Sequence, residues 1–133
     1  MHALLKSFLL LFIFTFTKLQ AQQLKWSQID GTDGLASDTV LSVYAEHDSL
    51  IWIGTKKGLC RYNGQQVSFF FNGALGANVQ SVYEIVKVQG AIWIRTDAGI
   101  SRLANGSFTN YNTSNGLLSQ QISDIEGDGL GNL

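Results

Sequence analysis

The chain has 133 residues, of which 45% are apolar and 14% are charged, with fourteen glycines and no proline. This composition excludes an intrinsically disordered chain, because enough apolar and aromatic surface is available for burial. The formal net charge of −1, without a dense cluster of lysine and arginine, argues against nucleic-acid binding, which needs a concentrated cationic face.

The N-terminal segment, residues 1–21, is typical of a secretory signal peptide. Lys6 precedes an apolar run between residues 8 and 16, and Ala21 offers a small residue for cleavage. The run is too short to span about 30 Å of hydrocarbon as a settled helix. We therefore expect residues 1–21 to be removed and residues 22–133 to be exported to the periplasm or beyond; an uncleaved membrane anchor is the alternative.

Four strand-like runs follow the leader, separated mostly by glycine, asparagine, aspartate or serine, which favour turns. They comprise residues 40–44, 50–55, 58–62 and 66–71. The run Ile51-Trp52-Ile53 is apolar at every position, so its strand must be covered on both faces. A sheet of four short strands that is covered on both sides is typical of one blade of a β-propeller.

The same unit recurs further along the chain. The segment 51–62 matches the segment 92–103 at one constant offset, with Ile, Trp, Ile, Thr, Gly and Arg in register. Upstream, residues 40–44 match residues 79–83 at an offset of 39. A third copy begins with Asn-Gly-Leu-Leu-Ser at residues 115–119 and runs to the end of the sequence. Recurrence at one spacing of about 40 residues predicts an array of repeated units.

The sequence therefore predicts an all-β fold in the form of a partial β-propeller. Two complete four-stranded blades are expected at about residues 33–74 and 75–114, and a truncated third blade at residues 115–133. The tryptophans of the repeat, Trp52 and Trp93, are expected to pack one blade against the next.

The recurring residues are assigned structural roles. They are Trp52, Gly54, Thr55, Gly58 and Arg61 in the first copy, and Trp93, Thr96, Gly99 and Arg102 in the second. Arg95 stands where the first copy has Gly54, and a glycine inside a strand often marks a close approach of two backbones. We expect Arg95 to reach solvent in a degenerate repeat; a ligand-facing role is the alternative.

These segments resemble the two-component regulator propeller repeat over about residues 33–133. The matching segments are Gly34-Leu35-Ala36-Ser37, Trp52-Ile53-Gly54-Thr55, Gly58-Leu59-Cys60-Arg61-Tyr62 and Gly129-Leu130-Gly131-Asn132-Leu133. In that family the propeller lies outside the cytoplasmic membrane and precedes a sandwich domain, a membrane-crossing helix and a histidine kinase. The resemblance implies a sensing region with an extracellular carbohydrate as ligand, and with further blades and a membrane-bound histidine kinase as partners.

No catalytic, cofactor or metal site is predicted. Residues 124–129 half resemble a calcium loop, but the third position is Glu126 and the position of the bidentate carboxylate would fall past Leu133. Cys60 lies in an apolar run, and a small buried side chain explains it. His47 is expected in an exposed turn.

The sequence thus favours an exported, non-enzymatic region of a two-component sensor that binds or senses a ligand. Two alternatives stay open: a fragment of a propeller-fold lyase or hydrolase, and a truncated gene remnant without independent function.

Overall fold

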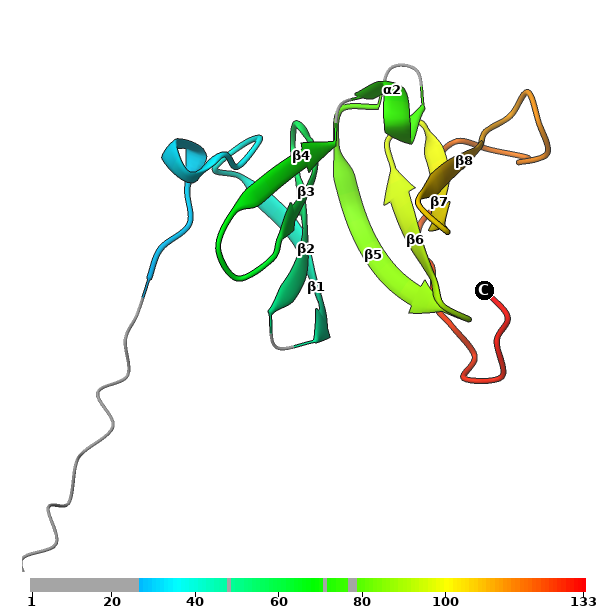
Figure 1. Ribbon diagram of the computed structural model, residues 1–133. Coiled ribbons are helices and arrows are strands. Elements are labelled where there is room, and N and C mark those ends of the chain that lie inside the picture. The colour runs from blue at the N-terminus through cyan, green and yellow to red at the C-terminus, as the bar shows by residue number, and fades with distance from the viewer. Residues whose placement is uncertain (1–26, 48, 71, 77–78) are drawn as a thin grey trace, which may run out of the picture.

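A computed structural model describes residues 27–47, 49–70, 72–76 and 79–133. The predicted signal peptide, residues 1–21, lies outside the described residues. Within them, two antiparallel four-stranded sheets follow each other along the chain (Figure 1). The prediction of an all-β chain with two four-stranded units is confirmed.

The strands of each sheet are neighbours in chain order. The first sheet contains β1 (Val40–His47), β2 (Leu50–Thr55), β3 (Gly58–Tyr62) and β4 (Val67–Phe70). The second contains β5 (Val82–Val88), β6 (Ala91–Thr96), β7 (Gly99–Ala104) and β8 (Ser107–Tyr111). A 3-10 turn, η1 (Gly31–Asp33), precedes the first sheet, and a short helix, α2 (Asn72–Leu75), lies between the two sheets. The predicted bounds of β2 and β3 are correct, whereas β1 continues to His47, beyond the predicted end at Tyr44.

A threonine and a glycine close the central hairpin of each sheet in the same way. The Thr55 hydroxyl donates to the Gly58 carbonyl over 2.9 Å, and the Thr96 hydroxyl donates to the Gly99 carbonyl over 3.0 Å. Gly58 and Gly99 have φ angles of 128° and 124°, a conformation that other residues rarely adopt. The Thr and Gly of the repeat are therefore required by the hairpin itself.

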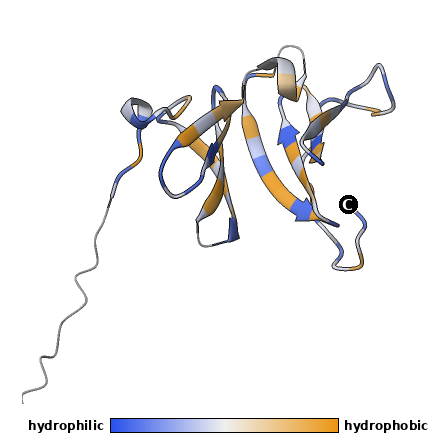
Figure 2. Ribbon diagram, in the orientation of Figure 1, coloured by the Kyte–Doolittle hydropathy of each residue, from blue (hydrophilic) through white to orange (hydrophobic). Residues whose placement is uncertain are grey.

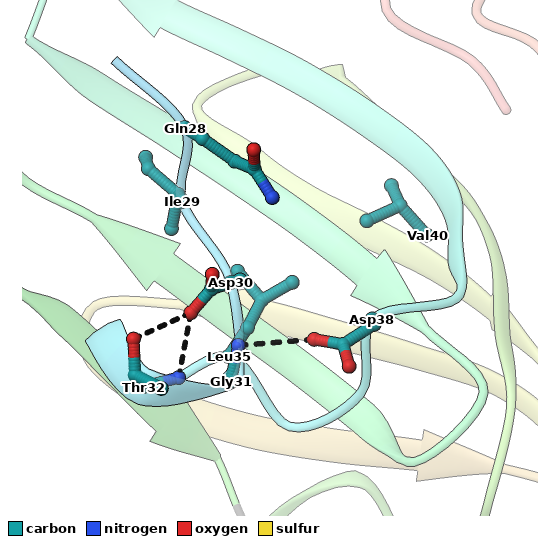
Figure 3. Close-up of a pocket in the computed structure, with 8 residues that line it drawn as sticks. All are labelled: Gln28, Ile29, Asp30, Gly31, Thr32, Leu35, Asp38 and Val40. Carbon is teal, nitrogen blue, oxygen red and sulfur yellow. Dashed lines mark hydrogen bonds between the residues drawn. The ribbon is translucent and has the colours of Figure 1, made fainter.

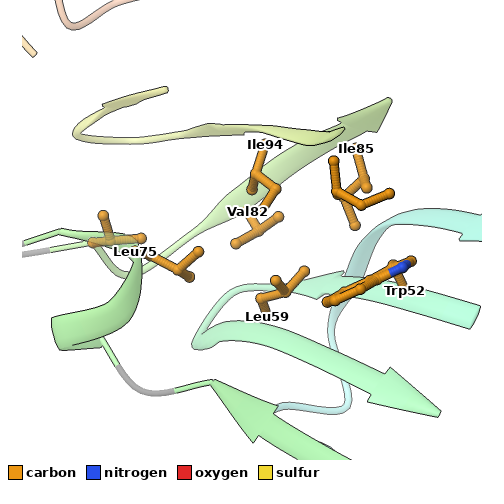
Figure 4. Packing of buried hydrophobic residues seen from close by; sticks show 8 residues of the cluster. Trp52, Leu59, Leu75, Val82, Ile85 and Ile94 are labelled. Atoms are coloured by element: carbon orange, nitrogen blue, oxygen red, sulfur yellow. The ribbon is translucent and has the colours of Figure 1, made fainter. Parts of the chain in front are cut away.

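The two sheets share one core. Strand β5 packs against β1 and β2, so the second sheet faces the first (Figure 1). Residues of both sheets and of the connection between them fill the space, as Figure 4 shows, and Figure 2 shows apolar residues along the strands of both sheets. The buried members are Trp52, Leu59, Leu75, Val79, Val82, Ile85, Ile92 and Ile94.

A second cluster covers the opposite face of the first sheet, and its buried members are Leu35, Ile53 and Cys60. Trp52 and Ile53 are neighbours in β2, and their side chains enter different clusters because successive residues of a strand point to opposite faces. Both residues are buried. The prediction that this strand is covered on both faces is confirmed.

The first strands of the two sheets correspond in a different register from the one that the sequence match gave, so the predicted offset of 39 is wrong. Ser42 pairs with Gly54 in the first sheet, and Glu84 pairs with Arg95 in the second. Val79, which the sequence match placed at the start of the strand, precedes β5 and is buried in the shared core. Register depends on which side chains become buried between the sheets, and a short match of letters does not determine it.

The turn that opens the first sheet has a counterpart after the second sheet. The Asp30 amide donates to the Asp33 carboxylate over 3.0 Å, and the Asn112 amide donates to the Asn115 side-chain oxygen over 2.7 Å. In the first turn the Thr32 hydroxyl also donates to the Asp30 carboxylate. In the second turn the Ser114 hydroxyl donates to the Asn112 side-chain oxygen in the same way. Residues 119–126 then run along the second sheet without joining a ladder. Residues 112–133, which begin with this turn and are called the third unit, therefore start with the same hydrogen bonds as the turn before the first sheet.

Candidate functional site

Each sheet stacks an arginine on the tryptophan of its neighbouring strand. Arg61 lies 5.7 Å from the Trp52 ring centre, and Arg102 lies 5.5 Å from the Trp93 ring centre. Within each pair, the tryptophan and the arginine are directly opposite each other in the ladder, where side chains on one face are close enough to interact. Trp52 is buried between the sheets, whereas Trp93 lies on the far face of the second sheet and is half-buried.

At Gly54 the two sheets are in close contact. A β-carbon there would lie 2.6 Å from Val82 Cγ1 and 2.7 Å from the Val82 carbonyl oxygen, and it would also collide with the Ser42 hydroxyl. That hydroxyl donates to the same Val82 carbonyl over 3.5 Å. The close backbone approach that the sequence predicted at Gly54 is confirmed.

Arg95 takes the equivalent position in the second sheet and contacts the start of the third unit. Its Nε donates to Glu84 Oε2 over 2.9 Å, and its Nη1 donates to the Ile122 carbonyl over 3.1 Å. The Ile125 amide donates to the same Glu84 oxygen over 3.1 Å. We expected a solvent-reaching Arg95, but its side chain is 19% exposed because Glu84 and the third unit surround it.

A charged pair joins the two sheets near the end of β1. Lys87 Nζ lies 2.5 Å from Glu46 Oε1, and the Trp52 indole donates to Glu46 Oε2 over 3.0 Å. The hydrogen bond from Lys87, followed by that from Trp52, lowers the pKa of Glu46 below its ordinary value. The Glu46 carboxylate in turn raises the pKa of Lys87. Both shifts favour the ion pair at neutral pH.

A depression of about 490 Å³ lies beside η1 and the beginning of β1 (Figure 3). Asp38 and Asp30 border it, and both carboxylates accept hydrogen bonds from the adjacent turn. The Gly31 amide donates to Asp38 over 3.0 Å, and the Thr32 amide donates to Asp30 over 2.8 Å. Hydrogen bonds from Thr32 lower the pKa of Asp30. These carboxylates stabilise the turn.

The acidic segment near residue 128 also closes a turn on itself. Asp128 accepts hydrogen bonds from the Leu130 amide over 2.7 Å and from the Asn132 amide over 3.0 Å. The hydrogen bonds from Asn132 lower the pKa of Asp128. In the described part of the chain, no group of three or more His, Cys, Asp and Glu side chains has the arrangement to hold a metal ion.

The thiol of Cys60 is fully buried on the outer face of the first sheet. Its sulfur accepts a hydrogen bond from the Ala36 amide over 3.3 Å. Burial raises the pKa of the thiol, which disfavours the nucleophilic thiolate. None of the helices among the described residues has the length and apolar character needed to cross a membrane.

The sequence reasoning missed the charged contacts between units, which are made by Glu46, Glu84 and Lys87. A signal was present, because Glu46 and Lys87 have opposite charges and stand one repeat apart in the sequence. Glu84 and the Ile125 amide are separated by the same interval. In a stacked array, residues one repeat apart become spatial neighbours.

Neither a protein-family model nor a curated protein matches this chain. Its function is therefore inferred from the repeated unit and from the contacts between the units.

Proposed function

We propose that the chain is the exported, non-catalytic sensing region of a two-component signal-transduction sensor, and that its sheets are blades of a β-propeller. The observation that carries the proposal is the repetition between the two sheets. The Trp–Arg pair, the Thr–Gly hairpin and the four-strand order recur, and the second sheet covers the tryptophan face of the first. A row of such covered sheets is what a propeller requires.

In this proposal the ligand is an extracellular carbohydrate, as the resemblance of the repeat implies. The β2–β3 and β6–β7 hairpins offer polar groups suited to sugar hydroxyls, with Lys56, Lys57 and Asp97 exposed in their turns. Ligand contact through Lys56, Lys57 and Asp97 leaves the covered faces of the sheets free to pack, because these three side chains are exposed.

The DNA that follows the codon for Leu133 provides the most direct test. The sensor proposal expects an open reading frame that encodes further Trp-Ile-Gly-Thr units, a membrane-crossing helix and a histidine kinase. A stop codon at that point in the gene would contradict the sensor assignment.

Export is tested separately by sequencing the N-terminus of the protein recovered from the periplasm of a bacterial host. We expect the mature chain to begin at Gln22, after removal of residues 1–21. Recovery of an uncleaved chain from the cytoplasm would contradict export.

The ligand class is tested by titrating residues 22–133 with a panel of defined neutral and acidic oligosaccharides and recording backbone amide NMR shifts. Saturable shifts confined to the hairpin turns would support the proposal. The matched variants are Lys56→Ala/Lys57→Ala in the turn and Gln65→Ala/Gln66→Ala in the β3–β4 connection, which is also exposed. Only the first pair is expected to weaken binding. Absence of saturable shifts across the panel would contradict carbohydrate as the ligand.

A further inference from the structure

The turns that begin at Asp30 and at Asn112 also share their backbone hydrogen bonds. The amides three and five residues further on donate to the Asp30 carbonyl over 3.0 and 3.2 Å, and the corresponding amides donate to the Asn112 carbonyl over 3.2 and 3.0 Å. The second turn directly follows β8, the fourth strand of its sheet, which ends at Tyr111. Ile29, which directly precedes the first turn, therefore stands where a fourth strand ends.

The sequence that ends at Ile29 also has the pattern of a fourth strand. Residues 25–29 are Lys-Trp-Ser-Gln-Ile, residues 66–70 are Gln-Val-Ser-Phe-Phe and residues 107–111 are Ser-Phe-Thr-Asn-Tyr. In each segment the first residue is polar, the second and the fifth are apolar or aromatic, and the third carries a hydroxyl group. The second and third segments contain β4 and β8. Among the described residues, residues 27–29 belong to no ladder, so this fourth strand lacks the three strands that would complete its sheet.

Ile29 lies over the first sheet as the end of β4 lies over the second sheet. Phe70, the last residue of β4, contacts Phe108 of the second sheet with ring centres 5.6 Å apart. One unit earlier, Val67 holds the position of Phe108 in the ladder register, and Ile29 holds the position of Phe70. Ile29 and Val67 both pack against the cluster on the outer face of the first sheet. The contact between two successive sheets is thus repeated by Ile29, although no sheet precedes the first one among the described residues.

The outer face of the first sheet corresponds to the face of the second sheet that the first sheet covers. Val82 and Ile85 of β5 are buried in the shared core, where they are 0% and 6% exposed (Figure 4). Their counterparts in β1, from the ladder register, are Val40 and Val43, which are 44% and 62% exposed. Val40 borders the depression beside η1, which Ile29 also borders (Figure 3). A sheet whose fourth strand ends at Ile29 would cover these two valines as the first sheet covers their counterparts in β5.

We propose that the segment ending at Ile29 is the fourth strand of a further sheet, whose other three strands come from a later copy of the repeat in the same polypeptide. The inference rests on the further units that the proposed function expects after Leu133. That sheet turns its tryptophan face toward the outer face of the first sheet, and backbone hydrogen bonds of an antiparallel ladder join it to the segment. The beginning and the end of the array are thereby linked, and the exposed apolar surface of the first sheet becomes covered.

The experiment compares hydrogen exchange in the polypeptide encoded by the complete reading frame with hydrogen exchange in residues 22–133 alone. Mass spectrometry follows the peptides that contain residues 27–29. We expect their amides to exchange at least about tenfold more slowly in the complete polypeptide, because only there does a ladder protect them. The difference should not depend on protein concentration, since the three strands belong to the same chain. Equal exchange in the two forms would overturn the proposal.

Two proline variants of the complete polypeptide, Ser27→Pro and Gln28→Pro, test for the ladder directly and serve as each other's control. Successive amides of a strand at the edge of a sheet point in opposite directions, so only one of these two donates to the neighbouring strand. Proline removes the amide hydrogen and is tolerated where that amide faces solvent. We expect protection of the segment to fall at least about tenfold in one variant only. Equal behaviour of the two variants would overturn the strand assignment, and this comparison decides the question even if residues 22–133 do not fold alone.

The inference and the proposed function fail in different ways. Further repeats without a histidine kinase, together with protection of residues 27–29, would contradict the sensor role and support the fourth strand. Further repeats with a histidine kinase, but without that protection, would overturn the fourth strand alone. Protection that increases with protein concentration would mean that a second chain supplies the three strands, and a stop codon directly after Leu133 would leave no later copy to supply them. Either result would overturn the inference.

Discussion

Gly54 and Arg95 hold the same position in their two sheets, opposite Ser42 and Glu84 in the ladders, but they join the next unit in different ways. At Gly54 the absence of a side chain lets the backbone of β5 come into direct contact. At Arg95 a guanidinium and a carboxylate bridge to the next segment. One repeat position thus supports direct contact with the backbone of the next sheet in one unit and a bridge through charged side chains in the other.

Replacing Gly54 with alanine is expected to destabilise the fold, because the new β-carbon would collide with Val82 and with the Ser42 hydroxyl. Overpacking of this kind costs about 1–3 kcal/mol of unfolding free energy. Urea denaturation followed by tryptophan fluorescence measures the loss. Gly73→Ala is the control, since no atom lies within 4 Å of its new β-carbon and the residue belongs to α2. Equal stability of the two variants would contradict the close approach.

The two tryptophans of the repeat are expected to differ in their contribution to stability. Trp52 is 3% exposed between the sheets, whereas Trp93 is half-buried on the outer face. Truncation of a buried aromatic residue costs about 3–5 kcal/mol. Trp52→Ala is therefore expected to lose several kcal/mol of unfolding free energy and Trp93→Ala less than half as much. Similar losses would indicate that Trp93 is covered by another surface in solution.

The strands are predictable because local chemistry determines them. A short apolar run such as Ile51-Trp52-Ile53 between turn residues predicts a strand that is covered on both faces. The Thr–Gly spacing likewise fixes each hairpin, since Gly58 and Gly99 adopt a conformation that disfavours a side chain. For β2 and β3 the predicted bounds are correct.

The contacts between units are harder to predict, because they join residues about one repeat apart in the sequence. The match of Val79 with Val40 is misleading: Val79 is buried between the sheets ahead of β5, and Val82 takes the place of Val40. The role of Arg95 depends on Glu84 and on the third unit, and neither follows from the repeat pattern alone.

The stability of the chain is expected to depend on pH through Glu46. Its pKa is lowered in the folded state, by Lys87 first and then by Trp52, from an ordinary value of 4.5. A lowered pKa gives stabilisation that is fully present above 4.5 and is lost as the pH falls through the folded-state pKa. The melting temperature of the natural chain should therefore exceed that of Glu46→Gln near neutral pH, and the gap should close in acid.

Glu126→Gln serves as the control for this comparison, because Glu126 is an exposed carboxylate outside the contact between the sheets. The contribution of Lys87 to stability is lost at the other end of the pH scale. Because the pKa of Lys87 is raised in the folded state, its stabilisation is lost as the pH rises through the folded-state pKa, above 10.5. A gap between the natural chain and Glu46→Gln that stays constant from neutral to strongly acidic pH would contradict the ion pair.

Cys60 is expected to be unreactive in the folded protein. The side chain is fully buried and burial raises its pKa, so both access and thiolate formation are disfavoured. An aromatic disulfide reagent should react slowly in buffer and rapidly in urea, at a rate limited by opening of the first sheet. Rapid reaction in buffer would mean that the N-terminal segment around Ala36 does not cover the thiol.

Glu84→Gln is expected to loosen the start of the third unit without unfolding the two sheets. The carboxylate accepts from Arg95 and from the Ile125 amide at one oxygen, and a neutral amide weakens both charge-assisted hydrogen bonds. Hydrogen exchange measured by NMR should therefore speed up at the Ile125 amide by at least about tenfold, while amides of β6 and β7 keep their protection. Glu126→Gln, next to Ile125 in the chain, removes the same charge without this contact and should leave the exchange rate unchanged. Acceleration across both sheets would instead mean that Glu84 supports the fold as a whole, because protection is then lost by global opening and not by release of one segment.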